Sequence, residues 1–212
     1  MSLNLDSPDE ESSIPLLYFN MQDSSLILTD DIAHDIFNNG YFGQWTSKNT
    51  LVLEPEEILL LIDRKRISLV HFTTNQKITS AELVAHFTRI NKFFWSRYLV
   101  YKDLRNRGYV VRIGTKVTAP FRIYSRGGKP GESISKKVIF PLSEGEDLDL
   151  DFLDQLVNQS KIDRKTLLLS VVDRLGDVTY YQASQLELEH NELEYEYRDE
   201  LPQITPENKE ED

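Results

Sequence analysis

The residue types that most often carry chemistry are either missing from this sequence or scattered along it. The chain has no cysteine, which excludes disulfides, thiolate metal sites and cysteine nucleophiles. The glycine-rich segment 127–131 lacks the G-x-x-x-x-G-K-[ST] order of a nucleotide-binding loop, and no G-x-S-x-G marks a serine hydrolase. The histidines show no paired spacing typical of metal ligands. They are His34, His71, His86 and His190. We therefore predict neither a metal site nor a cofactor.

The clearest chemical signal in the composition is a segregation of charge. Residues 89–137 hold thirteen Lys and Arg against two acids, a net charge of +11, although the whole chain carries −11. Such a stretch is typical of proteins that bind the phosphate backbone of nucleic acids. The alternative is an ordinary solvated helix face followed by lysines at a strand edge. The segment 187–212 carries a net charge of −9, which predicts a disordered acidic tail.

The composition also limits the class of protein. With 212 residues, of which 40% are hydrophobic, the chain can bury a core and is not a disordered protein. No apolar run is long enough to span a membrane, and the acidic residues 1–13 do not resemble a signal peptide. We expect a disordered leader over 1–13 and a cytoplasmic protein that makes no membrane contact.

The apolar periodicity predicts the helices and strands that must position any site. The pattern predicts an α/β (α+β) fold with two small mixed domains, residues 14–85 and 86–186, of which the second is a mixed sheet packed with helices. In the first domain we expect a hairpin over 16–21 and 25–29, a helix over 30–37, strands over 42–45 and 50–53, and a helix over 54–66. In the second region we expect a helical block over 79–104 that breaks near Asn91, strands over 109–113, 121–124 and 137–140, a helix over 147–160, and strands over 167–172 and 178–183.

Three segments carry a specific resemblance. Residues 101–112 read YKDLRNRGYVVR, residues 121–132 read FRIYSRGGKPGE, and residues 164–181 read RKTLLLSVVDRLGDVTYY. In this order and spacing they resemble the archaeal tRNA-intron (tRNA-splicing) endonucleases over about residues 98–183, which implies that the mixed sheet of the second domain is of the nuclease type. The first half resembles that family more loosely, through Gly40 to Gly43 and the predicted helix near Glu56.

The resemblance implies a metal-independent reaction. The family cuts precursor tRNA at a bulge-helix-bulge, where a 2′-hydroxyl attacks the adjacent phosphate to leave a 2′,3′-cyclic phosphate and a 5′-hydroxyl. Its catalytic Tyr and Lys match Tyr124 and Lys165, but the position of the catalytic His is occupied by Ile134. An Arg that the family places seven residues before the Lys is replaced by Asn158. A missing proton-transfer group costs about 10²- to 10⁴-fold in rate.

The resemblance also assigns contacts outside the reaction centre. For RNA binding we expect four basic residues: Arg122, Arg126, Lys129 and Arg164. For subunit contacts we expect the loop and strand residues Asp173, Asp177, Tyr180 and Tyr181. The implied partners are precursor tRNA and a catalytic subunit, with a heterotetramer as the expected assembly.

Three functions remain open from the sequence. The two departures in the site favour a structural subunit that holds a catalytic partner on the RNA. A complete enzyme acting as a homo-oligomer, with another group replacing His, is the second. The third is an assembly protein that kept the fold and lost RNA contact, which would show no salt-dependent RNA binding.

Overall fold

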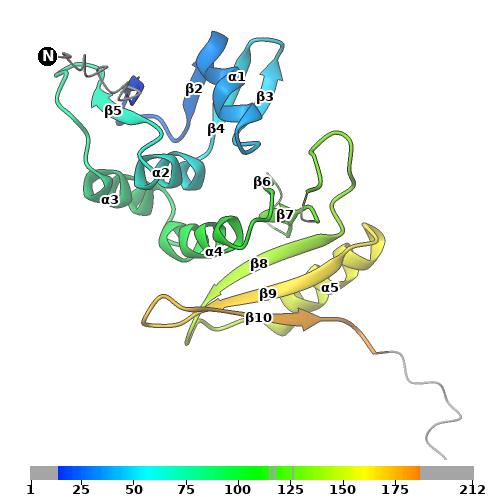
Figure 1. Cartoon of the computed structure of the whole chain (residues 1–212). Coiled ribbons are helices and arrows are strands. Elements are labelled where there is room, and N and C mark those ends of the chain that lie inside the picture. The colour runs from blue at the N-terminus through cyan, green and yellow to red at the C-terminus, as the bar shows by residue number, and fades with distance from the viewer. Residues whose placement is uncertain (1–13, 115, 117, 126, 187–212) are drawn as a thin grey trace, which may run out of the picture.

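The computed structural model describes residues 14–114, 116, 118–125 and 127–186, so the predicted leader and acidic tail lie outside the described residues. The predicted mixed α/β class is confirmed: five helices and three small sheets alternate along the described chain. Figure 1 shows the N-terminal elements above and a larger C-terminal sheet below, with the helix α4 between them.

The N-terminal region contains two separate sheets. Strands β2 (Leu26–Thr29), β4 (Thr50–Leu53) and β3 (Gln44–Ser47) form an antiparallel sheet on which α1 (Asp30–Asn38) packs. Strand β1 (Leu16–Phe19) pairs in parallel with β5 (Ser68–His71). The hairpin predicted for the first two strands is therefore wrong.

The physical reason for that error is a strand that the sequence analysis did not predict. In β5, Leu69 and Val70 are buried and the element has only four residues, so it offers too little alternation to stand out from the preceding helix. Once β5 is present, β1 takes it as a parallel partner, with α2 in the crossover between them. The turn at 20–25 then joins two sheets rather than two paired strands.

Three helices lie between the antiparallel N-terminal sheet and the C-terminal sheet along the chain, with β5 between the first and the second. Helix α2 (Pro55–Asp63) begins with a capping box between Glu54 and Glu57 and a proline in its first turn. Helix α3 (Ser80–Ile90) has the Thr79–Glu82 capping box that the sequence predicts. The predicted break is confirmed, because α3 ends before Asn91, and α4 (Phe94–Asn106) begins three residues later.

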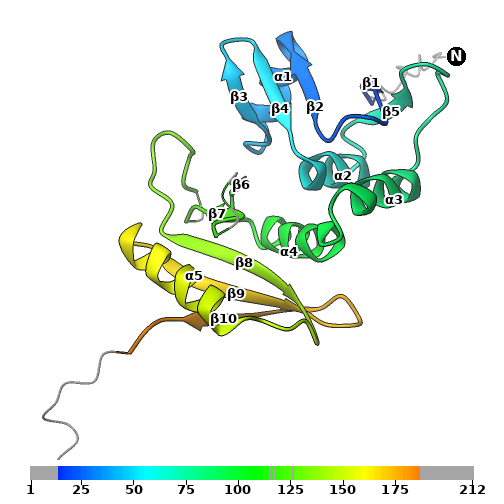
Figure 2. The ribbon, with the colours of Figure 1, turned by 180° about the vertical axis from the view of Figure 1, so that it is seen from behind.

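The C-terminal sheet has five strands in the order β10-β9-β8-β7-β6. Their bounds are β6 Val111–Ile113, β7 Phe121–Ile123, β8 Lys137–Ser143, β9 Thr166–Val172 and β10 Val178–Ala183. Strands β8 and β9 are parallel and joined by α5 (Leu150–Ile162), whereas the other neighbours are antiparallel. Figure 2 shows α5 on one face of this sheet, and α4 lies on the other.

Both faces of β9, an interior strand of the sheet, are covered, as its apolar sequence predicts. Leu167 packs with Leu156 of α5, whereas Leu168 packs against the main core. That main core is continuous: it includes Phe42 from the N-terminal region, Tyr98 and Tyr101 from α4, and Phe121 from the sheet. The two regions therefore share one core through α4.

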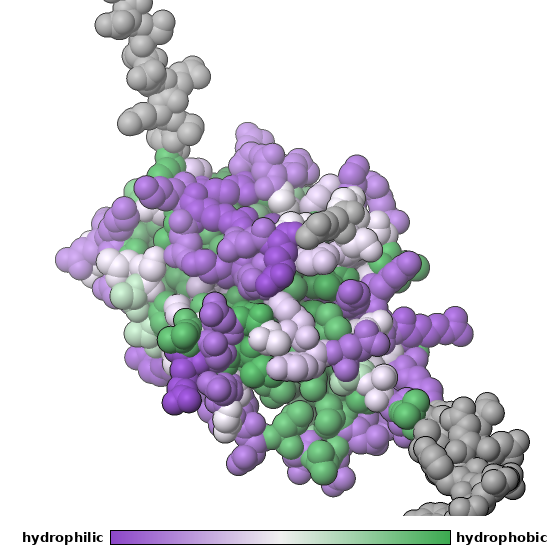
Figure 3. Space-filling model, turned by 60° about the horizontal axis from the view of Figure 1, so that its bottom comes forward, coloured by the Kyte–Doolittle hydropathy of each residue, from purple (hydrophilic) through white to green (hydrophobic). Residues whose placement is uncertain are grey.

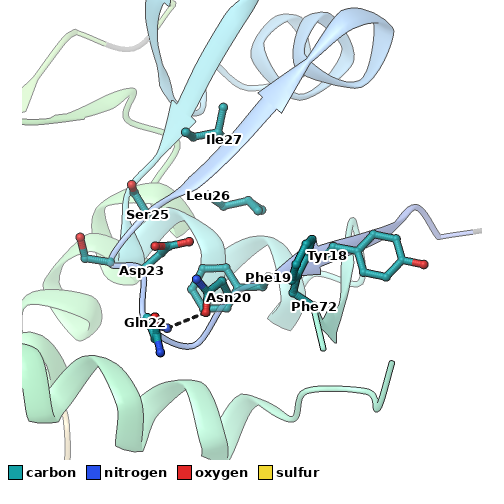
Figure 4. A pocket seen from close by; sticks show the side chains of 10 residues that line it. Tyr18, Phe19, Asn20, Gln22, Asp23, Ser25, Leu26, Ile27 and Phe72 are labelled. Atoms are coloured by element: carbon teal, nitrogen blue, oxygen red, sulfur yellow. Dashed lines mark hydrogen bonds between the residues drawn. The ribbon is translucent and has the colours of Figure 1, made fainter. Parts of the chain in front are cut away.

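A hollow of about 610 Å³ lies in the N-terminal region between β1 and β2. Figure 4 shows the rings of Tyr18 and Phe72 on one side of it and the turn carrying Asp23 on the other. Its lining has no basic side chain and offers no match to an RNA phosphate. No helix in the described part of the chain is long and apolar enough to cross a membrane.

Candidate active site

The register of the C-terminal sheet brings the two expected catalytic positions to one end of it. Ile123 of β7 pairs with Lys137 of β8, and Lys137 pairs with Thr166 of β9. Tyr124 is one residue beyond the first strand and Lys165 one residue before the last, so both lie at this end. Because neighbouring strands are about 4.8 Å apart, their Cα atoms lie roughly 10 Å apart across β8.

Lys136 occupies the position between them. Its carbonyl accepts a hydrogen bond from the backbone N–H of Thr166 at 2.9 Å, and the backbone N–H of Tyr124 donates to Val110 at 3.0 Å. The ladders thus continue past the named strands. The sequence analysis did not single out Lys136, because only the sheet register shows which residue separates Tyr124 from Lys165.

The end of α5 fixes the backbone at Lys165. Its N–H donates to the carbonyl of Ser160 at 2.8 Å, and the N–H of Arg164 donates to that of Lys161 at 3.0 Å. This is a Schellman ending, in which the residue after the cap takes the left-handed conformation. Arg164 has φ of 52°, although glycine is the usual residue there. Arg164 therefore has a strained backbone, and its exposed side chain follows directly before Lys165 in the chain.

A groove of about 470 Å³ lies beside Tyr124. Its other lining residues are Tyr109, Ile123, Ser125, Lys136 and Lys137. This lining includes two lysines and no acid. In the described part of the chain, neither lysine forms an ion pair, and the same is true of Lys165. The groove is therefore electropositive.

Ile134 lies in the connection between β7 and β8, and 84% of it is exposed. This connection is ordered by its own turn, in which the N–H of Ser133 donates to the carbonyl of Lys129 at 2.9 Å. The side chain of Lys129 lies 3.9 Å from Glu132, and both are well exposed. An isoleucine side chain can neither donate nor accept a proton, so this loop brings no proton-transfer group to the site through Ile134.

The histidines in the described residues lie in the N-terminal region and the helix that follows it. His34 packs against Trp45, His71 contacts Thr73, and His86 is buried with its ring nitrogen 2.8 Å from the carbonyl of Asp23. None of them belongs to the C-terminal sheet. His190 lies outside the described residues.

The other expected RNA contacts are placed unequally. Arg122 is half-buried on β7 opposite Arg112, and its Nε has no hydrogen-bond partner among the described atoms. Lys129 and Arg164 are exposed, and Arg126 lies outside the described residues. Asn158, at the family's Arg position, donates to Asp154 of the same helix at 2.7 Å.

Much of the basic stretch 89–137 is used inside the fold. Arg97 contacts Glu56 at 2.6 Å, Lys102 contacts Asp63 at 3.0 Å, and Arg107 contacts Asp103 at 2.6 Å. Two more of its arginines, Arg105 and Arg112, donate to the carbonyls of Gly40 and Gly43. Four of these cations tie α4 and β6 to neighbouring elements, and Arg107 pairs within the last turn of α4, so the length of the stretch overstates its surface charge.

A cluster at the junction of the two regions was missed by the sequence analysis. The Phe42 ring has the Arg105 guanidinium 4.0 Å and that of Arg66 5.6 Å from its centre. Glu57 is buried beside it and accepts hydrogen bonds from the N–H groups of Gly43 at 2.8 Å and Glu54 at 3.0 Å. Burial nevertheless raises the pKa of Glu57 to about 7. This cluster is a structural joint between the two regions.

The expected subunit contacts also differ in exposure. Tyr180 is half-buried, and its hydroxyl donates to Asp103 at 2.7 Å, so burial and this carboxylate raise its pKa. Tyr181 is 56% exposed. Asp173 accepts from the N–H groups of Leu175 at 2.8 Å and Asp177 at 2.9 Å, which closes the hairpin between β9 and β10.

Comparison with known proteins identifies the family of both regions. Residues 18–84 match the family model of the tRNA intron endonuclease N-terminal domain, and residues 94–180 match that of the tRNA intron endonuclease catalytic C-terminal domain. A protein named tRNA-splicing endonuclease from Methanothermobacter thermautotrophicus is 31% identical over 156 residues, which cover 73% of this chain and 88% of that protein. The chain belongs to the tRNA intron endonuclease family.

Other relatives differ from this family member in length. The tRNA-splicing endonuclease of Thermococcus gammatolerans is 30% identical over 168 residues, which cover 79% of this chain and 96% of that protein. That of Methanococcoides burtonii is 32% identical over 167 residues, which cover 78% of this chain but only 46% of that protein. The relatives therefore match both regions of this chain. In one relative the matched part is nearly the whole protein, and in the other it is about half.

Proposed function

We propose that this chain is a subunit of a tRNA-splicing endonuclease that removes introns from precursor tRNA, and that its role in the complex is structural. The observation that carries the proposal is Ile134. Motif spacing gives it the place of the family's His, on an exposed loop, and the histidines among the described residues all lie outside the C-terminal sheet.

The chemistry explains why this loss matters. Cleavage by the 2′-hydroxyl needs a base for that hydroxyl, an acid for the leaving 5′-oxygen and a cation for the phosphate. Tyr124 and Lys165 can supply a proton acceptor and a cation at one sheet end, but the acid is missing. A complete site would therefore be supplied by a histidine-bearing catalytic subunit, in a complex that we propose to be a heterotetramer.

Two surfaces support such an assembly. Strand β10 is an edge of the sheet with Tyr181 exposed, and the adjoining hairpin presents Leu175, which is 89% exposed, beside Asp177. Figure 3, which brings the bottom of Figure 1 forward, shows apolar surface among hydrophilic residues on this side. Such a surface fits a subunit contact better than free solvent.

A complete homo-oligomeric enzyme is the second candidate, favoured by the fact that Tyr124 and Lys165 are both present at the same sheet end. In that case another group must replace histidine. The third, an assembly protein without RNA contact, would not explain the electropositive groove.

Cleavage of a bulge-helix-bulge RNA tests the proposal. We expect no cleavage by this chain alone in EDTA, and cleavage to cyclic-phosphate ends once a histidine-bearing catalytic subunit is added. Lys165→Ala in this chain should leave the reconstituted reaction in place. Cleavage by the chain alone that Lys165→Ala abolishes would instead establish the homo-oligomeric enzyme.

A further inference from the structure

Three lysines that form no ion pair with the described residues lie at the end of the C-terminal sheet. Once the arginines and lysine that hold α4 and β6 are set aside, Lys136, Lys137 and Lys165 remain close together in the register across β8 and β9. Like charges placed opposite each other on neighbouring strands repel and destabilise a sheet. No acid lines the adjacent groove to offset them. An anionic ligand bound in the groove would offset this repulsion.

Lys136 holds the decisive position in this cluster. Its carbonyl is tied to the backbone of Thr166, so its Cα is fixed next to that of Lys165. On its other side, the register continued by one residue places it next to Tyr124. Its side chain is exposed and lines the groove, so the ammonium group is available to a ligand.

We propose that Lys136 is a phosphate-binding residue that holds an RNA phosphodiester in the groove beside Tyr124, between the two expected catalytic positions. The inference rests on the proposed function only in taking RNA as the ligand. It gives the incomplete site a task of its own: this chain grips the RNA backbone where it does not cut it. The proposed function gives Lys165 the role of the cation at the phosphate, and Lys136 adds a second cation from the neighbouring strand.

The test is binding of a fluorescently labelled bulge-helix-bulge RNA to this chain over a series of salt concentrations. Lys136→Ala should weaken binding roughly five- to tenfold near 0.1 M salt and lower the slope of log K against log salt by about 1. Lys136→Arg should retain most of the affinity because it keeps the charge. The control is Lys48→Ala, which removes an exposed lysine from the turn between β3 and β4 and should leave binding unchanged.

The outcomes separate this inference from the proposed function. Equal RNA affinities for Lys136→Ala and Lys48→Ala would overturn the inference while leaving the structural-subunit proposal intact. Absence of salt-dependent RNA binding by the unmodified chain would also overturn it. A loss specific to Lys136→Ala, together with failure to support cleavage by a catalytic subunit, would uphold the inference and reject the proposed function.

Discussion

By motif spacing, Ile134 takes the position of the family's catalytic His, and 84% of it is exposed. Its loop is held by turn hydrogen bonds and does not depend on the isoleucine side chain for packing. Substitution at this position should therefore change chemistry without changing the fold. One acid or base contributes about 10²- to 10⁴-fold to the cleavage rate, and restoring such a group at residue 134 allows this contribution to be measured.

We expect Ile134→His to give this chain RNA-cleaving activity of its own, about 10²- to 10⁴-fold above the unmodified chain. The measurement is cleavage of a bulge-helix-bulge RNA in EDTA with analysis of the cyclic-phosphate ends. Ile134→Gln serves as the control, because its amide is polar but does not titrate. Equal activity in both variants would show that the loop does not bring residue 134 to the phosphate.

Arg164 illustrates a conflict between stability and charge at the same sheet end. A non-glycine residue with φ of 52° lowers the stability of the fold by about 1 kcal/mol relative to glycine. We expect Arg164→Gly to raise the melting temperature by about 2–4 °C, measured by circular dichroism, while weakening RNA binding. Arg164→Lys keeps both charge and strain and should alter neither property strongly. A lower melting temperature for Arg164→Gly would contradict this account.

At the scale of elements, the hairpin between β9 and β10 separates a structural aspartate from an exposed one. Asp173 accepts two backbone hydrogen bonds, whereas Asp177 is exposed and its carboxylate forms no hydrogen bond or ion pair with the described residues. We expect Asp173→Ala to cost about 1–2 kcal/mol in urea unfolding, because it leaves those donors unpaired. Asp177→Ala should keep the stability and weaken association with a partner subunit, measured by sedimentation. The reverse pattern would show that Asp173 is the contact residue.

The elements also show what the sequence could and could not provide. The break at Asn91 and the capping box at Thr79 follow from local chemistry, and both are confirmed. The hairpin over 16–29 failed because β1 pairs with β5, some fifty residues away, and local alternation carries no information about such a partner. Lys136 escaped notice for the same reason: its neighbours Tyr124 and Lys165 become neighbours only through the sheet. The Tyr, Ile and Lys positions themselves came from motif spacing.

At the scale of the whole molecule, the junction around Glu57 makes stability depend on pH. Burial raises its pKa to about 7 in the folded state from about 4.5 in the unfolded chain. The folded state therefore binds this proton more tightly, so the contribution is full below about pH 4.5 and is lost as pH rises through 7. Its magnitude is up to about 3 kcal/mol.

We expect the unmodified chain to lose stability between pH 5 and pH 8 by about 3 kcal/mol more than Glu57→Gln does, since the amide does not titrate. Urea unfolding at several pH values measures both slopes. In the variant the amide NH₂ faces a backbone donor, which lowers its stability by an amount that does not depend on pH, so the comparison concerns slopes alone. Parallel slopes would show that another group governs the pH dependence.

Helix α4 packs on α2 and α3 on one side and on the C-terminal sheet on the other, within one continuous core. A hinge needs a segment with few buried contacts, and α4 is the opposite. The N-terminal region and the sheet end with Tyr124 are thus held at a fixed distance and angle. A ligand that touches both meets a preorganised surface and spends little of its binding free energy on ordering the protein. The chain therefore holds the shape of this surface before any ligand binds.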